Sequence, residues 1–197
     1  MKRKICLGLA AALVFCLTGC VQRAPTTTSE GADWDADWTL VGTTIGIEEP
    51  GNGLTLLDNK DALTASGLYY AAWVIGEAED YVNADGDTVD LYDAQLYVLL
   101  QDCDDETAAQ ASVDGWQAQE EEAYNVLSVE TADCAGQTFT ILIYETADEE
   151  NPYASGVSAF TAYQDHSINV ELACQDGFDG DAYAILTEFL EGFHYAE

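Results

Sequence analysis

A Ser-His-Asp triad needs a histidine beside the nucleophilic serine, and this chain offers few partners for such a pair. Ser158 lies in the stretch Gly-Val-Ser-Ala-Phe at residues 156–160. This stretch lacks the second glycine of a nucleophile elbow and falls inside a predicted strand. The two histidines are His166, in a predicted hairpin turn, and His194, at the end of the last predicted helix. We interpret His166 as solvated and predict no catalytic residue.

The common metal and phosphate motifs do not occur in the sequence. It contains no His-Glu-x-x-His, no Cys-x-x-Cys and no glycine-rich loop followed by Lys-Ser or Lys-Thr. Residues 83–87 with Asp90 resemble a fragment of a calcium loop. In the EF-hand register, however, the first and twelfth ligand positions are Tyr81 and Tyr92, which carry no carboxylate. An Asp-Gly hairpin turn explains this stretch, so we predict no metal and no cofactor.

Carboxylates are by far the most abundant ionisable groups in the sequence. The chain has 37 Asp and Glu against 5 Lys and Arg. A basic patch for nucleic acid or anionic lipid is excluded, because there are no cations to release phosphate counterions. Paired carboxylates could serve a glycoside hydrolase, but with so many acids the pattern singles out no pair. A solvated acidic surface that keeps the protein soluble is the simplest interpretation.

The N-terminus carries the clearest signal. A basic start, Met-Lys-Arg-Lys, precedes an apolar stretch from Ile5 to Leu17. This stretch is shorter than the roughly 20 residues that span a hydrocarbon core, but it has the usual length for a secretory signal. It ends in Leu17-Thr18-Gly19-Cys20, which resembles the lipobox of bacterial lipoproteins. The resemblance implies cleavage before Cys20 and diacylglycerol transfer to its thiol. The alternative is an ordinary signal peptide in which Cys20 is incidental.

These features divide the chain into three parts. We expect a lipoprotein signal peptide over residues 1–19, a flexible lipidated tether over residues 20–37 and one domain over residues 38–197. Membrane attachment would rest on the acyl chains at Cys20, because no later apolar run reaches the length of a span. We expect a monomer on the extracytoplasmic face of the cell membrane, with an envelope protein or a small ligand as partner.

Apolar spacing predicts a domain made mainly of strands, with two helices. Helical spacing of Ala109, Val113 and Trp116 predicts a helix over residues 104–123, and an apolar stripe predicts another over residues 181–193. Expected strands cover residues 39–47, 54–57, 68–75, 89–100, 124–131, 138–144, 157–163 and 167–173, with a helical turn over residues 58–65.

Two local patterns lead to further expectations. In the strand over residues 167–173, Asn169 and Glu171 alternate with apolar residues, so we expect this face of the sheet to be solvated. Trp34 and Trp38 lie before the first strand. We interpret them as packing where that strand enters the domain, with a ligand-stacking pair as the alternative.

Two helices on an antiparallel sheet of about six or seven strands make an α+β fold. The order of elements is a hairpin, further strands, a helix, an antiparallel meander and a C-terminal helix. This order is similar to that of Mog1/PsbP-like domains over residues 38–195, which implies a single sheet carrying both helices. Members of that class have mostly accessory and binding roles, and the resemblance implies no catalytic residues here.

The domain contains an odd set of three cysteines, in a compartment that permits disulfides. The expected strand directions place Cys103 and Cys134 at one edge of the sheet. Cys174 would lie at the other edge, about 17–20 Å away, beyond the roughly 7 Å Cα limit for a bridge. We therefore predict a Cys103–Cys134 disulfide and a free, buried Cys174. The alternative is that the pair stays reduced.

The sequence favours a lipid-anchored, non-catalytic binding or envelope-assembly module. Two alternatives stay open. One is a carboxylate-dependent hydrolase of an envelope or extracellular substrate, which a deep pocket with two facing carboxylates and a raised pKa would favour. The other is an acidic module that binds divalent cations loosely. A shallow apolar groove rimmed by tyrosines would favour binding.

Overall fold

A computed structural model describes residues 34–35, 38–58, 67–83, 86–147 and 151–196. The signal peptide, Cys20, most of the tether and the helical turn expected after Asp58 lie outside these residues. Within them, no helix combines the length and apolarity needed to cross a membrane.

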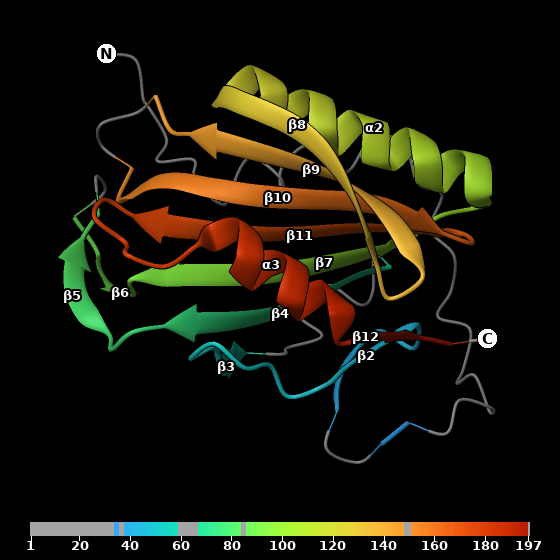
Figure 1. Ribbon diagram of the computed structural model, residues 1–197, viewed down its shortest axis with the longest axis horizontal. Helices are drawn as coiled ribbons and strands as arrows, with labels where there is room; N and C mark the ends of the chain where they lie inside the picture. Colours follow the sequence, from blue (N-terminus) through green and yellow to red (C-terminus); the bar gives the residue numbers. More distant parts are fainter. Residues whose placement is uncertain (1–33, 36–37, 59–66, 84–85, 148–150, 197) are drawn as a thin grey trace.

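An antiparallel sheet of 7 strands forms the centre of the domain (Figure 1). Its strands are β3 (Thr55–Asp58), β4 (Leu68–Ile75), β7 (Ala94–Asp102), β8 (Asn125–Cys134), β9 (Gln137–Glu145), β10 (Tyr153–Tyr163) and β11 (His166–Gln175). The lateral order is β3-β4-β7-β11-β10-β9-β8. Strands β8 to β11 pair with their sequence neighbours, whereas β7 pairs with the distant β11.

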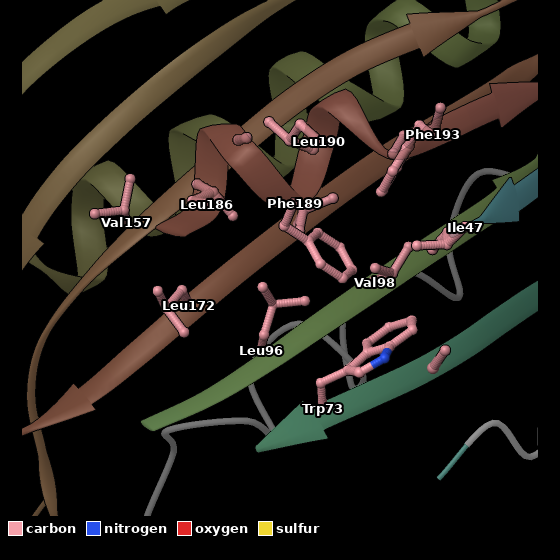
Figure 2. Packing of buried hydrophobic residues seen from close by; sticks show 14 of the residues in the cluster. Ile47, Trp73, Leu96, Val98, Val157, Leu172, Leu186, Phe189, Leu190 and Phe193 are labelled. Carbon is pink, nitrogen blue, oxygen red and sulfur yellow. The ribbon is translucent and has the colours of Figure 1, made fainter. Parts of the chain in front are cut away.

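Two helices pack on opposite faces of this sheet (Figures 1 and 2). Helix α2 (Glu106–Ala123) begins after Asp105, whose carboxylate accepts a hydrogen bond from the Ala108 amide at 2.8 Å. Helix α3 (Ala182–Glu191) begins after Asp181 in the same way, with a bond of 3.0 Å from the Ala184 amide. An aspartate before an apolar stripe therefore sets the start of both helices.

Two small sheets correct the expectation of a single sheet. One has the order β1-β2-β12, and the other is the hairpin β5-β6. Their strands are β1 (Thr39–Val41), β2 (Ile45–Ile47), β12 (Phe193–Tyr195), β5 (Glu79–Val82) and β6 (Thr88–Leu91). The strand expected over residues 39–47 is broken by a turn at Gly42, whose φ of 61° lies in the left-handed region. The strand expected over residues 89–100 is likewise divided between β6 and β7.

The C-terminal helix is shorter than its apolar stripe. It ends at Glu191, and Gly192 caps it, so that Phe193 and His194 belong to β12 instead. Strand β12 pairs with β2, with Phe193 opposite Ile47. Phe193, at the end of the amphipathic pattern, therefore lies in a strand, because it pairs with the distant β2.

The two faces of the large sheet differ in polarity. Side chains of β7, β10 and β11 pack with α3 in an apolar core, where Phe189 meets the ring of Trp73 at a centroid distance of 4.9 Å (Figure 2). The face under α2 has a smaller apolar cluster around Trp116 and also carries polar side chains. Asn169, expected to be solvated, lies on this second face and is only 4% exposed. That face of the sheet is therefore covered, and the candidate site lies on it.

Candidate functional site

Two glutamates and two tyrosines meet between α2 and the sheet. Glu120 continues the stripe of α2 that faces the sheet, one turn beyond the buried Trp116. Glu171 lies in β11, Tyr144 in β9, and Tyr124 directly after α2. The structure thus brings together residues from three elements, and we call this group the carboxyl–tyrosine site.

The tyrosines hold the carboxylate of Glu171. Both phenol hydroxyls donate to Glu171 Oε1, and the bond from Tyr124 measures 3.4 Å. The two rings stack with centroids 4.0 Å apart and planes 7° apart. Tyr144 reaches Glu171 by crossing β10 over Gly156, where a Cβ would collide with its ring and hydroxyl. The glycine of the Gly-Val-Ser-Ala-Phe stretch therefore makes room for a tyrosine and does not form a nucleophile elbow.

Burial perturbs the protonation of both carboxyls. It raises the pKa of Glu171, and the two tyrosine hydroxyls partly oppose this rise. It also raises the pKa of Glu120 well above its ordinary value, and the charge of Glu171 adds to the rise. Burial raises the pKa of Tyr124 and Tyr144 as well, so both phenols keep their protons and remain donors.

Two further polar side chains surround Glu120. Ser158 and Asn169 lie close enough to lower its pKa somewhat, and they are 0% and 4% exposed. Even so, Ser158 Oγ, Asn169 Nδ2 and Glu120 Oε2 are all buried without a hydrogen bond of acceptable geometry. Ser158 is thus part of a carboxyl environment, although its sequence context alone suggested no function.

The carboxyl–tyrosine site can hold a proton and can accept or donate hydrogen bonds. One carboxyl with a raised pKa beside a second is also the pairing used in acid–base hydrolysis. Both glutamates are half-buried at the margin of the helix–sheet interface. The described residues contain no group of three or more His, Cys, Asp or Glu that could hold a metal ion.

His166 is held by contacts and is not solvated as expected. Its Nε2 lies 3.0 Å from Thr44 Oγ1 and 3.3 Å from Asp102 Oδ1. Its Nδ1 lies 3.0 Å from Asp165 Oδ1. A hydroxyl, an imidazole and a carboxylate thus follow one another, as they do in nucleophilic sites.

The geometry around His166 nevertheless argues for a structural role. Nδ1 makes no hydrogen bond of acceptable angle, so the Asp165 carboxylate does not orient the ring as catalysis requires. Nε2 is shared between two partners, and Thr44 is only 5% exposed. These contacts attach the turn between β1 and β2 to the first residue of β11 in the large sheet.

The predicted Cys103–Cys134 bridge does not form in the structure. Cys103, Cys134 and Cys174 are all buried, and none of the three forms a disulfide. The alternating pairings do carry Cys103 and Cys134 to the same edge of the sheet, but three strands lie between β7 and β8. Four strand spacings amount to about 19 Å, far beyond the bridging limit. The sulfur of Cys103 lies near Ser167, under α2, whereas Cys134 belongs to the core under α3.

The other sequence expectations have mixed outcomes. Trp34 and Trp38 pack over Gly46 of β2, and Trp38 stacks on His194 with ring centroids 3.9 Å apart, which confirms their packing role. Strands β5 and β6 pair as a hairpin, as expected, and the Asp87 amide donates to Asn83 Oδ1 at 2.9 Å. Cys20 lies outside the described residues, so its lipidation stays a prediction.

An acidic groove of about 260 Å³ lies between the segment before β3 and helix α3. Asn52 donates to Glu188 at 2.6 Å across it, and His194 contacts Glu48 at 2.7 Å. The groove is rimmed by Glu48, Glu49, Glu188 and Glu191, over a floor that includes Leu54, Ile185 and Phe189. Its rim therefore consists of carboxylates and not of tyrosines.

A second hollow, of about 370 Å³, lies beside α2. Its lining includes Gln110, Gln137 and Thr140, which are polar but uncharged. Neither hollow includes Glu120 or Glu171 in its lining.

Neither a family model nor a curated protein matches this chain. Among solved structures, the chain is similar to the solution structure of cyanobacterial PsbP (CyanoP) from Synechocystis sp. PCC 6803, at 13% identity and a TM-score of 0.48, covering 87% of this chain and 98% of that one. It is also similar to a crystal structure from Bacteroides thetaiotaomicron VPI-5482, at 9% identity and a TM-score of 0.37. That likeness covers 81% of this chain and 48% of that one. Both TM-scores are below 0.5, so the proposals below rest on the geometry of this chain alone.

Proposed function

We propose that this protein is a lipid-anchored, extracytoplasmic, non-catalytic binding module that docks a basic segment of an envelope partner in the acidic groove. One observation carries the proposal. Four glutamates rim an open groove whose floor is partly apolar. A lysine or arginine side chain matches both parts, because its alkyl stem packs on apolar surface while its charge stays at the rim.

The charge balance of the whole chain supports the same partner chemistry. Only Arg23 and Lys60 remain as bases after the signal sequence, and both lie outside the described residues. The described surface therefore repels anions and attracts cations, and such long-range attraction speeds the encounter with a basic partner. It also makes that encounter sensitive to salt.

The anchor can be tested with Cys20→Ala. We expect this variant to leave the membrane fraction or to remain as an uncleaved precursor, because the acyl chains are then lost. Unchanged fractionation and unchanged mass would contradict lipidation at Cys20.

The docking groove can be tested by neutralising Glu49 and Glu188 together as glutamine. We expect weaker capture of the partner by cross-linking in intact cells, and weaker binding of a lysine-rich peptide by the purified domain. Glu121→Gln with Glu122→Gln is the matched control, because it removes equal charge from exposed positions on α2. Equal loss of binding in both pairs would mean that overall charge, and not the groove, attracts the partner.

A carboxylate-dependent hydrolase is the second candidate, and the raised pKa of Glu120 beside Glu171 favours it. In such enzymes a protonated carboxyl acts as the general acid while a second carboxylate acts as base or nucleophile. Hydrolysis of nitrophenyl glycosides by the purified domain, abolished by Glu120→Gln and retained by Glu122→Gln, would support this candidate over the binding module.

A further inference from the structure

The two edges of the large sheet differ in length and regularity. Strand β3, at one edge, has 4 residues, and its register with β4 shifts between Leu56 and Asp58. Strand β8, at the other edge, has 10 residues (Figure 1). Among the described residues β8 pairs with β9 alone, so no strand lies along its outer side. A short, irregular edge such as β3 resists the addition of another strand, whereas a long edge such as β8 is open to it.

Strand β8 lacks two of the features that usually close such an edge. It contains no proline and no lysine. Its bulge, at Leu127, lies near its start, and residues 128–134 then pair with β9 in continuous register. Val129, Glu130 and Thr131 are exposed in succession. Because successive side chains point to opposite faces, both faces of the sheet are open at this edge.

The side chains along β8 indicate which strand fits beside it. Val129 is 51% exposed and shares a face with Thr131, whereas Glu130 lies on the opposite face. No Lys or Arg occurs among the described residues, so none of them neutralises Glu130. Side chains that lie opposite each other on neighbouring strands contribute most when apolar or β-branched residues meet, or when opposite charges meet. A fitting strand therefore has apolar or β-branched residues on one face and basic residues on the other.

We propose that β8 is a docking edge for an extended segment of a partner protein, in which Lys or Arg alternates with apolar or β-branched residues. The segment extends the large sheet beyond β8, its backbone bonds to the outer N–H and C=O groups of residues 128–133, and a basic side chain lies beside Glu130. A second copy of this chain fits less well, because an identical strand would bring Glu130 and Asp133 but no base.

This inference goes beyond docking in the acidic groove. The carboxylates of that groove come from α3 and from the segment before β3, and β8 contributes nothing to its lining. The groove holds single basic side chains, whereas the β8 edge recognises an extended backbone as well as charge. The two surfaces can therefore be tested separately.

Hydrogen exchange of the mature chain, followed amide by amide by NMR, tests strand addition. The probe is an octapeptide in which lysine and valine alternate, and the control peptide has the same composition with lysines and valines arranged in pairs. At a probe concentration about ten times its Kd, every second amide over residues 128–133 should exchange about tenfold more slowly, because the outward N–H groups gain partners. The control peptide carries the same charge but cannot place all its lysines on one face, so it should protect these amides much less.

Glu130→Gln should weaken binding of the alternating peptide about two- to fivefold, which is the range of an exposed ion pair. The variant keeps an oxygen that can accept the hydrogen bond from Ser128. Glu122→Gln is the matched control, because it removes one charge from an exposed position on α2. Glu49→Gln with Glu188→Gln should leave the slowed exchange in β8 intact at saturating peptide, which separates failure of this edge from failure of the groove.

Two results would overturn the proposal. One is equal protection of β8 by both peptides, or protection by neither, because strand addition would then not depend on alternation or would not occur. The other is protection of β8 without peptide that grows with protein concentration. That result would show β8 pairing with a second copy of this chain.

Discussion

The phenol of Tyr144 occupies the space in which a side chain on Gly156 would stand. The two residues lie opposite each other on neighbouring strands, β9 and β10. Because glycine leaves this place open, the ring can cross β10 and its hydroxyl can donate to Glu171 on the next strand. The absence of a Cβ at Gly156 therefore permits one of the two phenol hydrogen bonds that Glu171 accepts.

Gly156→Ala should displace Tyr144 and destabilise the domain by about 1–3 kcal/mol, as overpacking a filled site commonly does. Urea unfolding measures this free energy. In a Tyr144→Ala background the same substitution should cost less, since the phenol is gone. Some cost should remain, because a Cβ at Gly156 would also lie 2.7 Å from the Leu172 carbonyl oxygen. Equal costs in the two backgrounds would contradict the contact.

Phe189→Ala should be among the most damaging substitutions in the domain. Phe189 is 3% exposed and packs against Trp73 between α3 and the sheet (Figure 2). Truncating a buried phenylalanine costs about 3–5 kcal/mol once the cavity is counted. Leu127→Ala is the control, since Leu127 is 56% exposed in β8. We expect a clear fall in the thermal midpoint for Phe189→Ala alone, and an unchanged midpoint would mean that α3 does not stabilise the core.

Acidic solution should stabilise the domain. Burial raises the pKa of Glu120 and Glu171 in the folded state. A group with a raised folded pKa contributes stability that is complete below its unfolded pKa, about 4.3 for Glu, and is lost as the pH rises through the folded pKa. Calorimetry should therefore show a melting temperature that falls as the pH rises above about 5. Glu120→Gln should flatten this slope while Glu122→Gln should not, and a melting temperature that rises with pH would contradict the sign.

The thiols should be reduced but slow to react. Burial raises the pKa of Cys174 to about 12, and it also raises that of Cys134. Because the thiolate is the reactive form, alkylation by iodoacetamide in the folded protein should be slow at both positions. In urea without reductant, mass spectrometry should find Cys103, Cys134 and Cys174 all alkylated. Alkylation of Cys174 alone would show that a Cys103–Cys134 bridge forms after all.

Local periodicity and capping determined where most elements lie. The strand expected over residues 68–75 is β4 from end to end, because a continuous apolar run suits a strand buried on both faces. Both helices begin within two residues of the expected positions, where an aspartate caps an apolar stripe. Strand reversal along the meander likewise places Cys103 and Cys134 at the same edge of the sheet.

Only the tertiary structure decided the lateral order of strands and which faces are covered. Strand β7 pairs with β11 and not with β8. Cys103 and Cys134 therefore lie far apart, although both are at the same end of the sheet. The alternation around Glu171 showed that β11 has two faces, but not that α2 would cover the polar one. Pairing between distant strands and the docking of a helix depend on the apolar surface buried over the whole sheet. Local periodicity in the sequence does not indicate this quantity. For that reason the carboxyl–tyrosine site, built from β9, β11 and the end of α2, left no motif in the sequence.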